Sequence, residues 1–144
     1  MQELIRFVIA IIALLLSTYF DTKEYKIPNW ITFTLIGIGT LINTYYYNTY
    51  SNIMVISSSI ILLVVLLTLF YKKLMGGGDV KLILGINIIS PFMFDKYIIG
   101  NVILLSFVFA FILKKSIPRY KSKGMPLAPA ITYGYLFSVL AMLI

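Results

Sequence analysis

Two carboxylates beside apolar segments are the residues of this sequence that could do chemistry. Asp21 closes the first apolar stretch, and Asp79 opens the fourth, directly after the glycines of MGGGDVKL (75–82). The chain contains no histidine and no cysteine, which excludes a Ser/His or Cys/His nucleophile and a Cys/His zinc site. Two carboxylates that lie close together share a proton, so one can activate water as a general base while the other protonates the scissile carbonyl. This chemistry predicts a hydrolase that needs neither a metal nor an organic cofactor.

The composition is that of an integral membrane protein. Hydrophobic residues make up 60% of the chain and charged residues only 12%, whereas soluble domains have about 45–50% apolar and about 25% charged residues. A helix needs about 20 mostly apolar residues to cross a bilayer. We therefore predict an all-α bundle of about six membrane-spanning helices in a single domain, residues 1–144. The uncharged runs that predict these helices are 4–20, 30–47, 53–71, 81–94, 97–113 and 127–144.

The fourth run is the least certain to cross the membrane. It is short and contains Pro91, and Asp95 and Lys96 alone separate it from the fifth run. The sequence predicts a tight helical hairpin there, with Asp95 as a turn residue.

Basic residues mark one side of the membrane. Ten of the twelve Lys and Arg residues lie in the segments after the first, third and fifth runs, and Arg6 and Lys96 lie on the opposite side. By the positive-inside rule these segments (21–29, 72–81 and 114–124) face the cytoplasm and both termini lie outside. The net charge of +7 is thus explained by topology, and no nucleic-acid partner is expected. Asp21 and Asp79 fall on the cytoplasmic side, where we expect them to face each other.

The residues around the two aspartates have predicted supporting roles. Gly76, Gly77 and Gly78 allow the backbone to turn with positive φ and leave room for a substrate backbone. The helix dipole favours a charge at the start of the fourth helix, which makes Asp79 a candidate base. Lys81 could lower the pKa of a carboxylate or contact substrate.

Ile27, Pro28 and Asn29 form a second supporting element before the second helix. Proline suits a first helical turn, and Asn29 could brace the loop that carries Asp21 through side-chain hydrogen bonds. A plain helix start is the alternative for these residues.

Each acidic residue also has a purely structural interpretation. Asp79 could be only a helix cap, and Asp21 could be a solvated loop charge. Glu24 is expected to be a solvated loop residue.

The joint pattern of these motifs resembles the prepilin peptidase family, the type IV prepilin and preflagellin peptidases. Its G-x-G-D motif is matched by Gly76-Gly77-Gly78-Asp79, and its aspartate followed by I/L-P-N is matched by Asp21 with Ile27-Pro28-Asn29. The proline-containing start of its last helix is similar to MPLAPA (125–130). The resemblance implies a membrane aspartic endopeptidase with Asp21 and Asp79 as its catalytic residues.

The resemblance also implies a substrate and a location. The substrate is a pilin-like or flagellin-like precursor, from which a short basic leader is removed at the cytoplasmic face of the inner membrane. In such precursors a hydrophobic helix follows the cleavage site. Larger family members carry an N-terminal region with C-x-x-C motifs that is linked to methylation. This chain starts directly in its first span and has no cysteine, so we expect the short, peptidase-only form.

Two other classes of protein are compatible with the sequence. Intramembrane carboxylates can relay protons in a small proton-coupled transporter, but no acidic residue lies near the middle of a predicted span. A catalytically silent assembly factor is the second alternative, and the presence of both aspartates argues against it.

Overall fold

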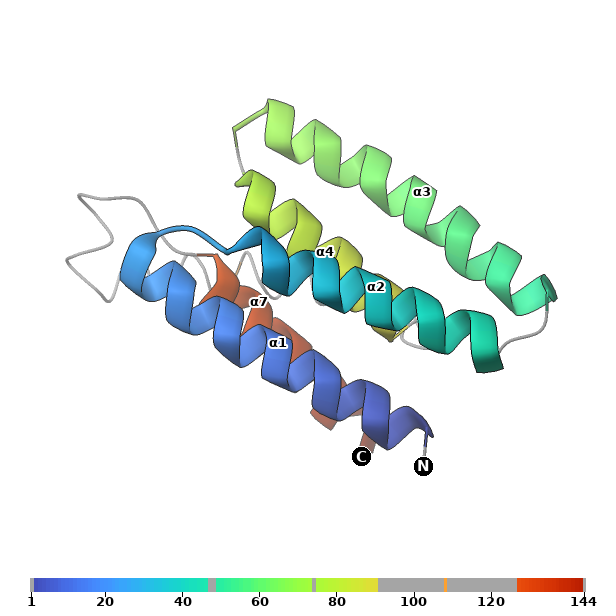
Figure 1. Cartoon of the computed structure of the whole chain (residues 1–144). Coiled ribbons are helices and arrows are strands. Elements are labelled where there is room, and N and C mark those ends of the chain that lie inside the picture. The colour runs from blue at the N-terminus through green and yellow to red at the C-terminus, as the bar shows by residue number, and fades with distance from the viewer. Residues whose placement is uncertain (1, 47–48, 74, 91–107, 109–126, 144) are drawn as a thin grey trace.

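The structure, a computed structural model, describes residues 2–46, 49–73, 75–90, 108 and 127–143 (Figure 1). Within these residues the regular elements are all helices, which confirms the predicted all-α class for this part of the chain. The helices are α1 (Gln2–Glu24), α2 (Asn29–Tyr46), α3 (Thr49–Tyr71), α4 (Gly77–Ile89) and α7 (Ala128–Leu143).

Five of the six predicted runs coincide with these helices. The fifth run, 97–113, lies outside the described residues apart from Val108, as do Pro91, Asp95 and Lys96. In the described part of the chain, one helix, Leu4–Glu24, is long and apolar enough to cross a membrane by itself. Two of the boundaries that differ from the prediction bear on the candidate residues: α1 continues beyond residue 20, and α4 begins before residue 81. Asp21 and Asp79 therefore lie within the terminal turns of helices.

Helix α4 occupies the centre of the bundle. It packs against α1, α2, α3 and α7, and α1 also packs against α2 and α7. One apolar core joins all five helices and contains Leu14, Leu35, Leu66, Leu82 and Ile131. The 13 residues of α4 rise about 20 Å, and the four helices that pack against it are longer.

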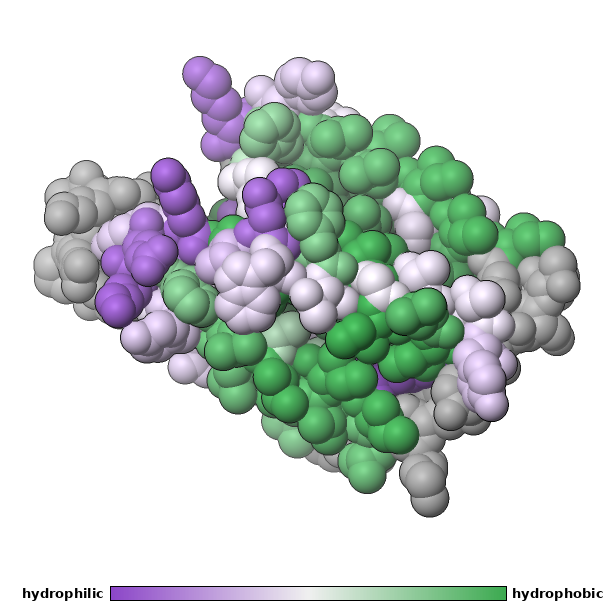
Figure 2. Space-filling view, in the orientation of Figure 1, coloured by the Kyte–Doolittle hydropathy of each residue, from purple (hydrophilic) through white to green (hydrophobic). Residues whose placement is uncertain are grey.

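The two ends of the bundle differ in chemistry. The segments that join α1 to α2 and α3 to α4 lie at one end together with the start of α7, and the start of α1 and the end of α7 lie at the other (Figure 1). Hydrophilic residues gather at the first of these ends, whereas hydrophobic residues cover most of the remaining visible surface (Figure 2).

Glycine allows α2 and α4 to approach closely. A Cβ atom on Gly39 would lie 3.0 Å from the backbone nitrogen of Ile89, and one on Gly85 would lie 2.9 Å from Cδ2 of Leu35. Gly37, two residues before Gly39 on the same helix, has nothing within 4 Å of such an atom. The spacing between α2 and α4 therefore depends on Gly39 and Gly85.

Two polar side chains fix the C-terminal end of α4. Arg6 is 1% exposed, and its Nη1 donates to the carbonyl oxygen of Ile89 at 3.1 Å and to Oδ1 of Asn43 at 2.6 Å. Asn43 in turn donates from Nδ2 to the carbonyl oxygen of Ile88 at 2.8 Å. A cation at the C-terminus of a helix is favoured by the helix dipole. Arg6 thus stabilises the helix that carries Asp79. The sequence did not indicate this role, because Arg6 was interpreted only as a charge on the outer side of the membrane.

We predict that Gly39→Ala lowers the thermal stability of the detergent-solubilised protein, whereas Gly37→Ala leaves it unchanged or raises it. The added methyl group at position 39 meets backbone atoms of α4, and overpacking of this kind costs about 1–3 kcal/mol. At position 37 alanine only restricts the unfolded chain, a gain of up to about 1 kcal/mol. Thermal unfolding of both variants is the measurement, and equal effects would contradict the proposed close contact.

Candidate active site

Asp21 and Asp79 line the same pocket at the hydrophilic end of the bundle. The pocket has a volume of about 550 Å³ and is lined by the segments 24–29 and 76–79 together with Asp21. Asp21 is 6% exposed and Asp79 is 8% exposed. The interpretation of Asp21 as a solvated loop charge is therefore wrong. Glu24 also lines the pocket and is exposed, as expected of a solvated residue.

The carboxylate of Asp21 is held by the start of α7. Its Oδ2 accepts a hydrogen bond from the backbone N–H of Ala128 at 2.9 Å. One turn earlier on α1, the hydroxyl oxygen of Thr18 lies 2.8 Å from that of Thr132, which joins the same two helices. Backbone N–H groups at a helix N-terminus favour a negatively charged partner. Burial disfavours the ionised form of Asp21, and the backbone N–H groups of Ala128 and Leu127 offset part of this effect.

The carboxylate of Asp79 lies in the first turn of α4 and caps this helix. Gly76 is the N-cap residue, and its backbone N–H donates to Oδ2 of Asp79 at 3.2 Å. The other oxygen, Oδ1, is buried and has no hydrogen-bond partner among the described residues. Asp79 is therefore not the N-cap residue that the sequence allowed: it accepts from the N-cap backbone as the third helical residue. This contact leaves one carboxyl oxygen available for another partner.

Asp79 retains its proton more strongly than an ordinary aspartate. Burial, followed by the neighbouring charge of Asp21, raises the pKa of Asp79 to about 7, against the opposing effect of the Gly76 N–H. The helix dipole predicted an ionised Asp79, but desolvation outweighs it. At pH 7 about half of the Asp79 side chains therefore carry a proton, beside a second carboxyl group.

At positions 76 and 78 glycine allows neighbouring side chains to approach the backbone closely. None of the three glycines at 76–78 has a positive φ, and Gly76 is extended with φ −77° and ψ 155°. The prediction of a positive-φ turn is therefore wrong. A Cβ atom on Gly76 would lie 2.9 Å from Oδ2 of Asp79, and one on Gly78 would lie 3.2 Å from Cβ of Ile27. Any side chain at 76 would displace the carboxylate that the Gly76 N–H holds.

The residues that have left-handed backbone conformations are instead Tyr25, with φ 55°, and Lys73, with φ 57°. They directly follow α1 and precede the segment that leads into α4. Tyr25 thus follows the end of α1 and Lys73 follows the end of α3, the helices that precede the pocket segments 24–29 and 76–79.

The Ile27-Pro28-Asn29 element connects the Asp21 side of the pocket to the Asp79 side. Ile27 is buried against Gly78, and Pro28 lies one residue before α2, not inside its first turn as predicted. Oδ1 of Asn29 accepts a hydrogen bond from Nζ of Lys81 at 2.9 Å, and Lys81 lies 5.5 Å from the centroid of the Phe33 ring. Asn29 thus ties the start of α2 to the start of α4. Lys81 serves this contact and is not among the groups that shift the pKa of Asp79.

The arrangement supports acid–base chemistry by two carboxyl groups. Over the described ranges, no group of three or more Asp, Glu, His or Cys side chains comes together in a way that could hold a metal ion. A protonated carboxyl group beside an ionised one can activate water and protonate a carbonyl oxygen. The pocket has room for the water and for a substrate backbone.

Comparison with known proteins agrees with the resemblance noted in the sequence. The sequence model of the type IV leader peptidase family matches residues 8–115, a range that includes Asp21 and Asp79. No significant match is found among curated proteins or among solved structures. Since the match covers most of the 144 residues of the chain, the chain belongs to the type IV leader peptidase family and is a peptidase of the leader-removing type.

Proposed function

We propose that the chain is a membrane-embedded aspartic endopeptidase, with Asp21 and Asp79 as its catalytic pair. The observation that carries this proposal is the burial of both carboxyl groups in one pocket. A pair of partly buried carboxyl groups that share a proton is the arrangement of aspartic proteases. The substrates are pilin-like or flagellin-like precursors, from which the enzyme removes a short basic leader.

The surroundings of the two aspartates support different roles. Asp21 accepts the N–H of Ala128 and acts as the general base, which takes a proton from water while the water oxygen attacks the scissile carbonyl carbon. Asp79, whose pKa is about 7, acts as the general acid and protonates the carbonyl oxygen. When the tetrahedral intermediate breaks down, the C–N bond cleaves, the leaving amine takes the proton from Asp21, and Asp79 recovers a proton from the hydroxyl group.

The charges that line the pocket suit a basic leader. Among the described residues that line it, Asp21, Glu24 and Asp79 are acidic and Lys26 is basic. This local excess of acidic groups offsets the lysine-rich surroundings of the site. A basic leader can therefore approach a pocket on a membrane face that is otherwise positively charged.

The outer surface supports a multi-pass location with the site on the cytoplasmic side of the inner membrane. Large apolar side chains are exposed along α1 and α3, among them Leu4, Ile12, Ile53, Ile60 and Val64. The hydrophilic end that contains the pocket (Figure 2) is also the end at which lysine-containing segments join α1 to α2 and α3 to α4. We infer six spans, with the termini on the opposite side of the membrane.

We predict that Asp21→Asn and Asp79→Asn each reduce cleavage of a cognate precursor below detection. Each substitution removes a proton-transfer group, which is worth about 10²–10⁴-fold in rate. Glu24→Gln is the matched control, because Glu24 lines the same pocket but is exposed, and it should retain cleavage. The product is scored by gel and mass spectrometry, and thermal unfolding checks that each variant is folded. Cleavage by either Asn variant would remove that residue from the proposed pair.

We predict that the cleavage rate declines above about pH 7, because Asp79, with a pKa of about 7, then loses the proton that it must donate. A steady-state pH profile with a descending limb near this value is the expected result, and a rate that stays constant to about pH 9 would contradict the role of Asp79 as the acid.

The same raised pKa has a consequence for stability. The folded state binds the Asp79 proton more tightly than the unfolded chain, whose pKa is 3.8. The free energy of unfolding should therefore fall as the pH rises from about 4 to about 7. Asp79→Asn removes the contribution of this side chain to that fall. Thermal unfolding across this range, compared between the two proteins, provides a readout that is independent of cleavage.

A further inference from the structure

Helix α4 has one face that the described helices leave at least partly exposed. Of its 13 residues, five are not buried, and four of these are Gly77, Lys81, Leu84 and Ile88. They are three or four positions apart and therefore lie on the same side of the helix. This uncovered face runs from the first turn of α4, beside Asp79, toward its other end.

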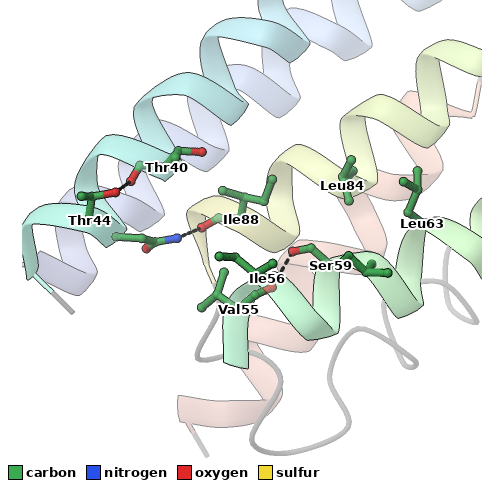
Figure 3. Close-up of a pocket in the computed structure, with 10 residues that line it drawn as sticks. Thr40, Thr44, Val55, Ile56, Ser59, Leu63, Leu84 and Ile88 are labelled. Atoms are coloured by element: carbon green, nitrogen blue, oxygen red, sulfur yellow. Dashed lines mark hydrogen bonds between the residues drawn. The ribbon is translucent and has the colours of Figure 1, made fainter. Parts of the chain in front are cut away.

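A groove lies over the distal part of this face. Leu84 and Ile88 form its floor, side chains from α2 and α3 form its two walls, and its volume is about 340 Å³ (Figure 3). The groove exists because α2 and α3 each pack against α4 and leave a gap between them along the uncovered face.

The chemistry of the groove selects an apolar occupant. None of its ten lining residues is charged. The hydroxyl groups of Thr40, Thr44 and Ser59 donate to carbonyl oxygens one turn earlier in their own helices. Because these polar groups already have partners, the groove offers aliphatic surface and requires no hydrogen bond from what it binds. A basic leader peptide does not fit this surface, but a hydrophobic helix does.

The uncovered face connects the groove to the catalytic pocket. Gly77, at one end of the face, lines the pocket that contains Asp21 and Asp79, and Leu84 and Ile88 line the groove. Lys81 lies between them, and its Nζ is held toward α2 by Asn29 and the Phe33 ring. A chain bound along this face would therefore pass from the carboxyl groups into the groove.

The dimensions of α4 set the register of such a chain. Leu84 and Ile88 lie about 7.5 Å and about 13.5 Å along the axis from Asp79, at 1.5 Å per residue. A helix whose first residue lies level with Asp79 and that runs parallel to α4 would place its sixth to tenth residues against the groove.

We propose that the groove between α2 and α3 binds the hydrophobic helix that follows the scissile bond of the precursor. This inference rests on the proposed function. Binding there holds the precursor beside α4 and so positions its scissile bond next to Asp21 and Asp79. The groove, rather than the catalytic pocket, then selects substrates for an apolar segment after the cleavage site.

Cross-linking tests this proposal directly, because the chain has no cysteine of its own. Ile60 lines the groove and is 58% exposed, whereas its neighbour Ile61 is 67% exposed but does not line it. Ile60→Cys and Ile61→Cys therefore form a matched pair. Each is mixed in proteoliposomes with a precursor that carries one cysteine at the seventh residue after the scissile bond, and a short bismaleimide is added. We expect at least about tenfold more enzyme–precursor adduct with Ile60→Cys, and competition by cysteine-free precursor.

A second groove position and the cleavage assay make the outcomes distinct. Ile56→Cys, also in the groove, should give the same adduct if Ile60→Cys proves unstable. Cleavage of the precursor with equal adduct at positions 60 and 61 would overturn the groove assignment and leave the proposed function intact. Adducts between two enzyme copies, without a precursor adduct, would assign the groove to self-association and would also overturn it. A failure of the unmodified chain to cleave any candidate precursor would overturn the proposed function, and the groove assignment with it.

Discussion

Two carboxyl groups held together in a buried pocket destabilise the fold that holds them, because each disfavours the ionised form of the other and burial disfavours both. The surrounding helices must therefore supply compensating contacts. The N–H of Ala128 stabilises Asp21, and the N–H of Gly76 stabilises Asp79. Both contacts come from backbone groups at helix starts, which are otherwise without partners. The pocket thus uses the unsatisfied ends of α4 and α7 to hold groups that would repel each other in isolation.

The same constraint explains why α4 is fixed at both ends and packed so closely along its length. Arg6 and Asn43 bind its last carbonyl oxygens, Gly39 and Gly85 bring it against α2, and the capping contact of Asp79 stabilises its first turn. A short helix that carries a buried acid has little apolar surface of its own with which to resist displacement. Contacts at its termini and close contact with α2 therefore determine where Asp79 lies relative to Asp21.

The sequence predicted the all-helical class and the pairing of Asp21 with Asp79, because charge sidedness and motif spacing depend on local residue types. It did not predict Ala128 as the partner of Asp21, since any residue but proline supplies a backbone N–H and only the fold brings α7 to α1. MPLAPA (125–130) was interpreted only as the proline-containing start of the last helix, which did not indicate that an N–H group there would bind Asp21. Arg6 was interpreted through its charge alone, and its burial depends on contacts with residues far along the chain. Of the two reasons given for the glycines at 76–78, positive φ is wrong and room for a substrate backbone stays a prediction. Sequence alone does not distinguish a need for positive φ from a need for close approach.

The difference between the two aspartates follows from which helix each one caps. Asp21 lies at the end of α1 but contacts the start of a different helix, α7, so the N–H of Ala128 reaches its carboxylate through space at 2.9 Å. Asp79 caps the helix to which it belongs, and this geometry uses only one of its oxygens, at the longer distance of 3.2 Å. Its second oxygen is buried without a partner in the described part of the chain, and a buried carboxylate oxygen without a partner favours the protonated form. In the proposed mechanism a carboxyl group can therefore be the base at position 21 and the acid at position 79. The start of α7 stabilises a negative charge on Asp21 more than α4 stabilises one on Asp79.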